Sequence, residues 1–386
     1  MPIVAGVDAF FDPNGRRFSA GSGMAFGRAS RRVTMMGTRS RGRGRRAVRP
    51  DCGALQRLVP YAERMMIMAD QRVKVGGSDL EVYPLALGGN TFGWTSDEAT
   101  SRAVLDAYTE AGGNFIDTAD VYSAWAPGNA GGESEIILGR WLAVRGNRDR
   151  VVIATKVSEH PQYKGLSRAN VLAAADESLL RLGVEEIDLY YAHFDDASTP
   201  LEETAAAFDE LVRAGKIRAI GLSNYTADRI EEWFRIAREH GYALPVALEP
   251  HYNLVTRGNY ERTLAPVAAR ENLAVFPYFS LAAGFLTGKY RSAADAEGKA
   301  RQGMVADYLN ADGFALVDAL DAVAKAHDAQ IATVALAWLR HRPQVAGPIA
   351  SARTPEQLPA LLASVALDLT DGEMAALDKA SEPFAK

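Results

Sequence analysis

Short apolar runs alternate with longer segments of helical periodicity along most of this chain, from about residue 73 to the C-terminus. In the runs almost every residue is apolar, which is typical of strands buried on both faces of a parallel sheet. The eight predicted strands cover residues 85–88, 114–117, 151–156, 187–191, 217–221, 246–249, 273–276 and 345–349.

The segments between the strands carry apolar residues at helical spacing. The predicted helices cover residues 97–111, 133–143, 168–182, 200–214, 227–239, 260–270, 331–339 and 355–363. We expect Ser96 to cap the first helix and Pro200 to occupy the first position of the fourth, because these residue types favour those places.

Eight strand–helix units predict a (β/α)8 TIM barrel of the α/β class. A short N-terminal hairpin around Gly76 and Gly77 precedes them, and two extra helices, 314–326 and 372–381, lie late in the chain. An open doubly wound sheet is the alternative, but it normally carries a glycine-rich fingerprint after its first strand. The residues after Leu87 read Gly-Gly-Asn-Thr-Phe-Gly and do not match that fingerprint.

The composition is ordinary for a globular protein, with 48% hydrophobic and 24% charged residues among 386. A formal net charge of −5 gives no reason to expect nucleic acid as a partner. No apolar run reaches the ~18 residues of a transmembrane helix, so no membrane partner is expected either. The single cysteine, Cys52, permits no disulfide within the chain, which fits the cytoplasmic location that we predict. The sequence indicates no particular oligomeric state.

The first part of the chain has a different texture. Residues 1–65 hold 13 Arg, no Lys and four acidic residues, without sustained helical or strand periodicity. We therefore interpret residues 1–68 as a basic disordered extension and residues 69–386 as the barrel domain. Three explanations of the extension stay open: a start codon assigned too early, with the true start near Met66 or Met68, a functional basic tail, or an organelle-targeting segment.

Polar side chains follow three neighbouring strands, at the end where the catalytic residues of such barrels lie. They are Asp117, Lys156 and His193, and Tyr122 stands in the loop after the first of these strands. Reduction of a carbonyl by hydride leaves negative charge on oxygen, so a proton donor is needed. A tyrosine can donate if a nearby lysine lowers its pKa from near 10, while an aspartate orients the lysine and a histidine hydrogen-bonds the oxygen.

These residues stand in motifs that resemble those of the aldo-keto reductase superfamily, from about Val73 to the C-terminus. The motifs are Asn114-Phe-Ile-Asp117-Thr-Ala-Asp-Val-Tyr122-Ser, Ile153-Ala-Thr-Lys156-Val, Asp188-Leu-Tyr-Tyr-Ala-His193, Gly221-Leu-Ser-Asn224-Tyr and Gly284-Phe-Leu-Thr-Gly-Lys289-Tyr. The resemblance implies an NADP-dependent oxidoreductase that reduces aldehydes or ketones to alcohols. It also implies a catalytic tetrad of Asp117, Tyr122 as proton donor, Lys156 and His193.

The resemblance further implies that NADPH lies extended at the barrel mouth. The matching positions are Ser223, Asn224, Glu249 and Tyr278 at the nicotinamide, Phe279, Ser280, Leu281, Ala282 and Lys289 at the pyrophosphate, and Ser351, Arg353 and Gln357 at the adenine end. Glu249 departs from the family, which usually has Gln there, and an ionised carboxylate accepts hydrogen bonds but does not donate them. Arg353 is the best candidate for the 2′-phosphate, because a guanidinium binds phosphate well.

The expected partner is a small-molecule carbonyl substrate, and its pocket is predicted to be walled by Trp94, Trp125 and Phe194. No metal is predicted, because the six His and one Cys show no zinc-ligand spacing. The alternative is a non-catalytic NADP-binding regulatory subunit, since potassium-channel β subunits are similar. Those subunits typically carry Asn at the position of His193, so the complete tetrad favours an enzyme.

Overall fold

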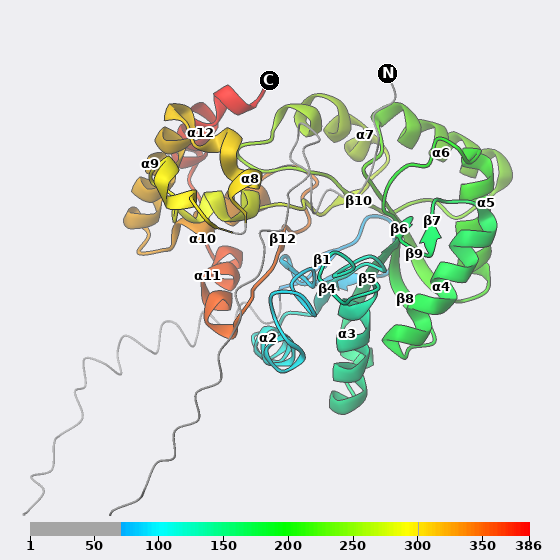
Figure 1. Ribbon diagram of the computed structural model, residues 1–386. Coiled ribbons are helices and arrows are strands. Elements are labelled where there is room, and N and C mark those ends of the chain that lie inside the picture. Colours follow the sequence, from blue (N-terminus) through cyan, green and yellow to red (C-terminus); the bar gives the residue numbers. More distant parts are fainter. Residues whose placement is uncertain (1–70, 300) are drawn as a thin grey trace, which may run out of the picture.

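The computed structural model describes residues 71–299 and 301–386, so the predicted extension of residues 1–68 lies outside the described residues. Parallel strands form one curved sheet with helices around it, in the order β11-β10-β9-β8-β5-β4-β3-β12 (Figure 1). The strands are β3 (Ala86–Gly88), β4 (Phe115–Asp117), β5 (Val152–Val157), β8 (Ile187–Ala192), β9 (Ile217–Ser223), β10 (Ala247–Glu249), β11 (Ala274–Val275) and β12 (Ile349–Ala350).

The two end strands of this sheet meet through the residues that precede β12. The N–H of Val275 in β11 donates to the carbonyl of Gln344 at 2.8 Å, and the N–H of Ala346 donates back to the carbonyl of Val275 at 2.9 Å. The N–H of Ile349 in β12 donates to the carbonyl of Pro277 at 2.9 Å. The sheet therefore closes on itself, which confirms the predicted (β/α)8 barrel over the open sheet.

The helices cover the outside of the sheet, and all of the predicted helical segments are helical. The long helices are α2 (Glu98–Glu110), α3 (Glu133–Arg145), α4 (Arg168–Leu182), α5 (Leu201–Arg213), α6 (Ala227–His240), α9 (Ala311–Ala326), α10 (Ile331–Arg340) and α12 (Asp371–Ala380). Shorter ones are α7 (Ala265–Arg270), α8 (Gln302–Val305) and α11 (Leu358–Leu362).

Two details at helix starts were predicted wrongly. The N-cap of α2 is Asp97, whose carboxylate accepts from the N–H of Thr100, and not Ser96, whose hydroxyl donates to the carbonyl of Arg353 at 2.9 Å. The N-cap of α5 is Pro200 itself, one position before the first helical residue. In both cases the helix starts one residue later than the prediction.

Two small hairpins flank the barrel sheet. The predicted N-terminal hairpin pairs β1 (Val73–Lys74) with β2 (Glu81–Val82), and a second one, absent from the prediction, pairs β6 (Glu159–His160) with β7 (Tyr163–Lys164). Val75, Leu80 and Val82 share a buried cluster with the side chains inside the barrel. The first hairpin therefore closes the end of the barrel at which the strands begin.

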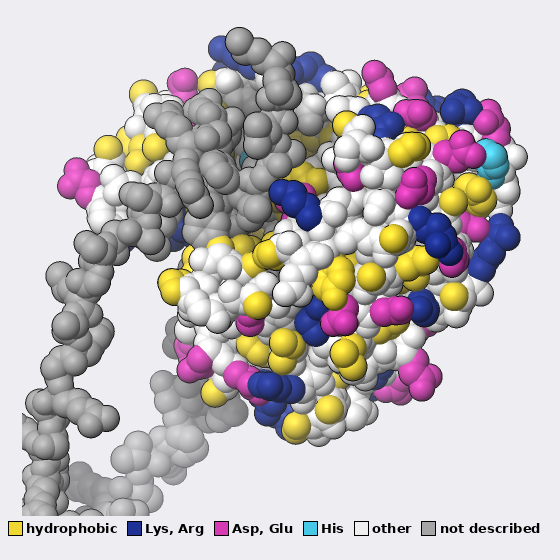
Figure 2. Space-filling view, turned by 45° about the vertical axis from the view of Figure 1, so that its right-hand side comes forward, with side chains coloured by type: hydrophobic (Ala, Val, Ile, Leu, Met, Phe, Trp, Pro, Cys, Tyr) yellow, Lys and Arg dark blue, Asp and Glu magenta, His cyan; other side chains and the backbone are white. Residues whose placement is uncertain are grey.

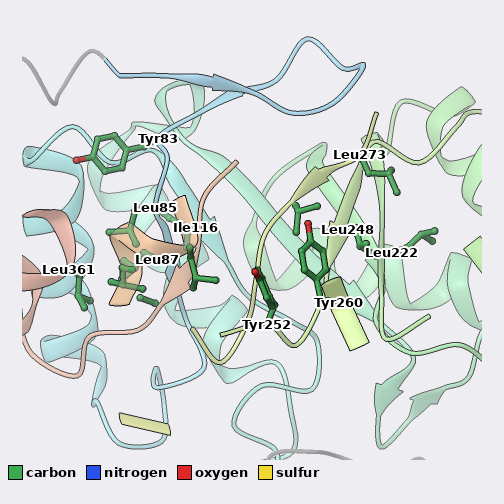
Figure 3. Close-up of a cluster of buried hydrophobic side chains, with 14 of the residues drawn as sticks. Tyr83, Leu85, Leu87, Ile116, Leu222, Leu248, Tyr252, Tyr260, Leu273 and Leu361 are labelled. Atoms are coloured by element: carbon green, nitrogen blue, oxygen red, sulfur yellow. The ribbon is translucent and has the colours of Figure 1, made fainter. Parts of the chain in front are cut away.

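The barrel separates two apolar layers. The cluster inside it includes Phe115, Leu189 and Phe276, whereas a larger one lies between the strands and the helices. Leu87 of β3 and Leu248 of β10 belong to that outer layer (Figure 3). Side chains that alternate along each strand thus fill both layers, which is the packing of a barrel without a pore.

Charged side chains of both signs are interspersed over the helices on the face shown in Figure 2. Many are paired, as Arg168 is with Glu210 and Arg235 with Glu239. In the described part of the chain, no helix combines the length and the apolar character needed to cross a membrane.

Candidate active site

The alternation along the strands places polar side chains inside the barrel at the end where the strands finish. Phe115 and Ala154 belong to the interior cluster, and two residues further along their strands stand Asp117 and Lys156. Side chains two apart on a strand share a face, so both groups point into the barrel. A buried ammonium needs partners, because an unpaired charge in such a place is costly.

Lys156 has those partners, although its side chain is 0% exposed. Its Nζ donates to Asp117 Oδ1 at 2.6 Å and to the carbonyl of Thr118 at 3.0 Å. The hydroxyl of Tyr122 lies 3.1 Å from the same nitrogen. Burial alone would lower the pKa of Lys156, but Asp117 and Glu249 outweigh it and raise the pKa above its ordinary value. The lysine is therefore charged at neutral pH.

Tyr122 lies in the turn after β4, and its hydroxyl is also 3.3 Å from Asp117 Oδ2. Burial raises the pKa of Tyr122 above its ordinary value, Lys156 lowers it, and Asp117 and Glu249 raise it. The predicted acidifying effect of the lysine is thus present but smaller than the effect of burial. The phenol carries its proton at neutral pH, which is the state that a proton donor requires.

His193 follows β8 and faces the same place. Its ring centroid is 6.3 Å from that of Tyr122 at an interplanar angle of 72°. Burial and then the charge of Lys156 lower the pKa of His193 well below its usual range, so the imidazole is neutral. Within residues 71–299 and 301–386, its Nδ1 has no hydrogen-bond partner. The structure therefore brings all four predicted tetrad residues together.

Glu249 ends β10 and belongs to the same group. Its side chain is 3% exposed, and its Oε1 lies 3.5 Å from Lys156 Nζ. Burial and Asp117 raise the pKa of Glu249 well above its usual range, although Lys156 opposes them. The sequence comparison with the family placed this residue at the nicotinamide amide, but its contact with the tetrad lysine was not predicted.

The residues predicted for the nicotinamide form one hydrogen-bonded chain. The hydroxyl of Tyr278 donates to Asn224 Oδ1 at 2.8 Å, and Asn224 Nδ2 donates to the carbonyl of His193 at 2.9 Å. The hydroxyl of Ser223 donates to the carbonyl of Glu249 at 2.9 Å. Asn224 has a positive φ of 56°, which asparagine tolerates better than most residues. These bonds fix the ends of β8, β9 and β10 relative to one another.

The loop predicted to hold the pyrophosphate has an unusual backbone. Phe279, Ala282 and Ala283 have φ values of 53°, 46° and 54°, which non-glycine residues rarely adopt. Ser280 is buried and donates to the carbonyl of Pro277 at 2.8 Å, whereas Leu281 is half-buried. Strained backbone of this kind clusters at binding sites.

Three cations gather beyond this loop. Burial and then Arg301 and Arg353 lower the pKa of Lys289, and burial and then Arg353 lower the pKa of Arg301. Arg353 is exposed, and its N–H donates to Gln357 Oε1 at 2.9 Å. Lys289 and Arg353 were predicted from the sequence. Arg301 was not, because the stretch around it carries no motif.

Ser351 and the aromatic residues complete the predicted set. The Ser351 hydroxyl donates to Asn90 Oδ1 at 2.8 Å, which holds the end of β12 against the loop after β3. Trp94 packs edge-on against Trp125 with 5.6 Å between centroids, and Trp125 packs against Tyr122 with 6.1 Å between centroids. Phe194 lies 5.0 Å from the ring of His193. Trp125 and Phe194 thus each pack against a tetrad residue, and Trp94 packs against Trp125.

In the part of the chain that the structure describes, no group of three or more His, Cys, Asp or Glu side chains is arranged to hold a metal ion.

A model of the aldo/keto reductase family matches residues 84–382. Protein tas of Escherichia coli (strain K12) is 32% identical over 339 residues, or 81% of this chain and 97% of that protein. A probable voltage-gated potassium channel subunit beta of Oryza sativa subsp. japonica is 32% identical over 303 residues, or 75% of this chain and 89% of that protein. An aryl-alcohol dehydrogenase (NADP(+)) of Phanerodontia chrysosporium is 32% identical over 357 residues, or 85% of this chain and 89% of that protein.

Proposed function

Because this chain belongs to the aldo/keto reductase family, we propose that it is a cytoplasmic, NADPH-dependent enzyme that reduces a small aldehyde or ketone to the alcohol. The observation that carries this proposal is the contact of one buried ammonium with both a carboxylate and a phenol. Lys156 Nζ lies 2.6 Å from Asp117 Oδ1 and 3.1 Å from the hydroxyl of Tyr122.

The proposed roles follow from this geometry. When bound, NADPH supplies the hydride that adds to the carbonyl carbon. Tyr122 gives its hydroxyl proton to the carbonyl oxygen, and the charge of Lys156 stabilises the phenolate that remains. Asp117 holds the ammonium in place, and neutral His193 donates a hydrogen bond to the substrate oxygen.

The described residues fit the cofactor on three counts. Positive charge gathers at Lys289, Arg301 and Arg353, where phosphate groups are expected. The half-buried ring of Tyr278 stacks on His251 with 5.2 Å between centroids, and it is the aromatic surface proposed for the nicotinamide. The strained turn at Phe279 and Ala282 is the proposed pyrophosphate loop. A dehydrogenase named for NADP(+) among the relatives supports the phosphorylated cofactor.

A regulatory subunit that binds the cofactor without turnover is the second candidate. It is favoured by the similarity to a protein named as a probable potassium channel subunit beta. The presence of His193 argues for an enzyme rather than a regulatory subunit, because its imidazole lies beside Tyr122 as an active tetrad requires. Stable capture of a channel protein, with no turnover on a broad carbonyl panel, would favour this candidate instead.

The first experiment replaces Tyr122 by Phe and follows NADPH oxidation with a panel of aldehydes and ketones. We expect kcat to fall by about 10²–10⁴-fold, since the proton donor is lost while the ring remains. NADPH binding, measured by quenching of protein fluorescence, should stay within about twofold. Near-full activity in Tyr122→Phe would disprove the role given to this hydroxyl.

A further inference from the structure

A second acid shares the buried pocket of the proposed tetrad. Asp117 and Glu249 both lie within ion-pair distance of Lys156 Nζ, at 2.6 Å and 3.5 Å. Both carboxyl groups are buried beside this one ammonium. In the described part of the chain, Glu249 Oε2 has no hydrogen-bond partner.

The charges of this pocket balance with only one carboxylate ionised. Lys156 contributes one positive charge, and the phenol of Tyr122 is neutral. A second ionised carboxylate would leave a negative charge uncompensated, and two carboxyl groups in one buried site do not readily ionise together. The titratable groups that face Glu249 are Asp117 of β4, Tyr122 after β4, Lys156 of β5 and Tyr191 of β8.

The proton belongs on Glu249 rather than on Asp117. Asp117 has the shorter contact with the ammonium and also lies 3.3 Å from the Tyr122 hydroxyl, which donates to it. These bonds favour its charged form. Glu249 has only the longer contact with the ammonium, so its ionised form is stabilised less than that of Asp117.

We propose that Glu249 is the proton reserve of this site: it holds a proton before reduction and replaces, through Lys156, the proton that Tyr122 gives to the substrate. This inference rests on the proposed reductase function. It makes Glu249 a participant in proton transfer rather than a substitute for an amide.

The step balances in protons and electrons. The hydride brings two electrons and forms the new C–H bond, and the carbonyl π pair becomes the oxygen lone pair that takes the Tyr122 proton. The phenolate recovers a proton from Lys156 over 3.1 Å, and the amine recovers one from Glu249 over 3.5 Å. Glu249 is left as a carboxylate and takes up a proton from water after the products leave.

The ionised Glu249 is expected to stabilise the oxidised cofactor, because the oxidised nicotinamide ring is cationic. A carboxylate beside that ring offsets its charge, whereas the neutral acid suits the uncharged reduced ring. Binding of NADP+ should therefore expel the proton of Glu249, and binding of NADPH should not. The two ligands carry the same phosphates, so the difference between them reports on the ring alone.

The test measures proton release when NADP+ or NADPH binds to the whole protein, by calorimetry in buffers of different ionisation enthalpy. Below the pKa of Glu249 we expect NADP+ to release close to one proton more than NADPH. The ratio of the two Kd values should then change about tenfold per pH unit in favour of NADP+ as pH rises. Equal proton release by both ligands in the unaltered protein would overturn the proposal without any variant.

Two variants test whether the released proton comes from Glu249. In Glu249→Gln the difference in proton release should vanish, and a difference that persists would overturn the proposal. In Tyr122→Phe it should persist, because the acid is still present although turnover is lost. If the proposed reductase function were wrong, neither NADP+ nor NADPH would bind, or no carbonyl compound would be reduced. Binding and turnover with equal proton release would reject only the role of Glu249.

Discussion

Arg353 is the residue on which the preference between the two nicotinamide cofactors is expected to depend. Its guanidinium is exposed beyond the strained loop, near Arg301 and Lys289. Three cations this close repel one another unless an anion lies between them. A 2′-phosphate is such an anion, and NADH lacks it.

Replacing Arg353 by Ser should weaken NADPH binding by about 10–100-fold, as the loss of a charged hydrogen bond of roughly 1.5–3 kcal/mol implies. NADH binding should change by less than about twofold. Arg291 is a matched control, since it pairs with Asp318 on the surface, and Arg291→Ser should alter neither affinity. An equal loss for both cofactors would show that Arg353 does not read the phosphate.

Contacts between individual residues were predictable from the sequence where those residues stand in recognisable motifs. Asp117, Tyr122, Lys156 and His193 follow consecutive strands, and their convergence follows from the barrel. The contact between Glu249 and Lys156 was not predicted, because β10 and β5 are separated by two strands in the sheet and meet only across the barrel interior. Arg301 was missed for a similar reason, since only folding brings it beside Arg353.

Helices α3 and α4 show how closely two elements pack in this fold. A Cβ on Gly139 of α3 would come within 2.4 Å of the carbonyl oxygen of Arg181 and 2.7 Å of that of Leu182, both in α4. Backbone atoms cannot move aside as side chains do. The absence of a side chain at this position therefore sets the distance between the two helices.

Gly139→Ala should destabilise the protein by about 1–3 kcal/mol, the usual cost of overpacking, although alanine favours an isolated helix by about 1 kcal/mol. Gly372 of α12 is the control, because a Cβ there would meet only the Thr370 hydroxyl at 4.0 Å. Gly372→Ala should leave the midpoint of urea unfolding unchanged or raise it. A stabilised Gly139→Ala protein would contradict the packing of α3 on α4.

The elements were predictable where the sequence marks their ends. Helix α4 spans Arg168–Leu182 as predicted, because Ser167 caps its start and Gly183 ends it with a φ of 65°. The β6–β7 hairpin was missed, since two-residue strands show no periodicity. Residues 260–270 are helical as predicted, but the first turn, Tyr260–Leu264, is a π-helix.

Arg257 is a buried contact between the C-terminal segment and the rest of the barrel domain. Arg257, which is 8% exposed, donates to the carbonyl of Asp378 at 3.0 Å and to the hydroxyl of Ser381 at 2.7 Å. Its guanidinium also lies 5.4 Å from the ring centroid of Trp338 in α10. The loop after β10, α10 and the end of α12 therefore meet at this side chain.

Arg257→Ala should lower the free energy of unfolding by about 2–4 kcal/mol, because it removes a buried guanidinium that bonds the Ser381 hydroxyl and pairs with Glu261. Arg235→Ala removes a surface pair with Glu239 and should cost less than about 1 kcal/mol. Thermal unfolding of the two variants beside the unaltered protein compares them. Equal midpoints would mean that the C-terminal segment does not depend on Arg257.

Of the whole molecule, the strand–helix order and the closed barrel were predicted, but the form of the seam at which the sheet closes was not. Residues 345–349 were predicted as a strand, yet only Ile349–Ala350 form one, and Val345 makes an isolated bridge to Val275. The preceding residues bond to β11 singly rather than as a ladder. The contacts at this seam join residues that are far apart in the sequence, which local periodicity does not record.

That seam has a consequence for how the barrel fluctuates. β11 and β12 each hold two residues, whereas β5, β8 and β9 hold six, six and seven. Few hydrogen bonds must break there to separate β11 from β12. Backbone amides along residues 274–277 and 344–350 should therefore exchange with deuterated solvent sooner than those of β8. The barrel is therefore expected to open most readily between its seventh and eighth strands, β11 and β12, on the side away from its longest strands.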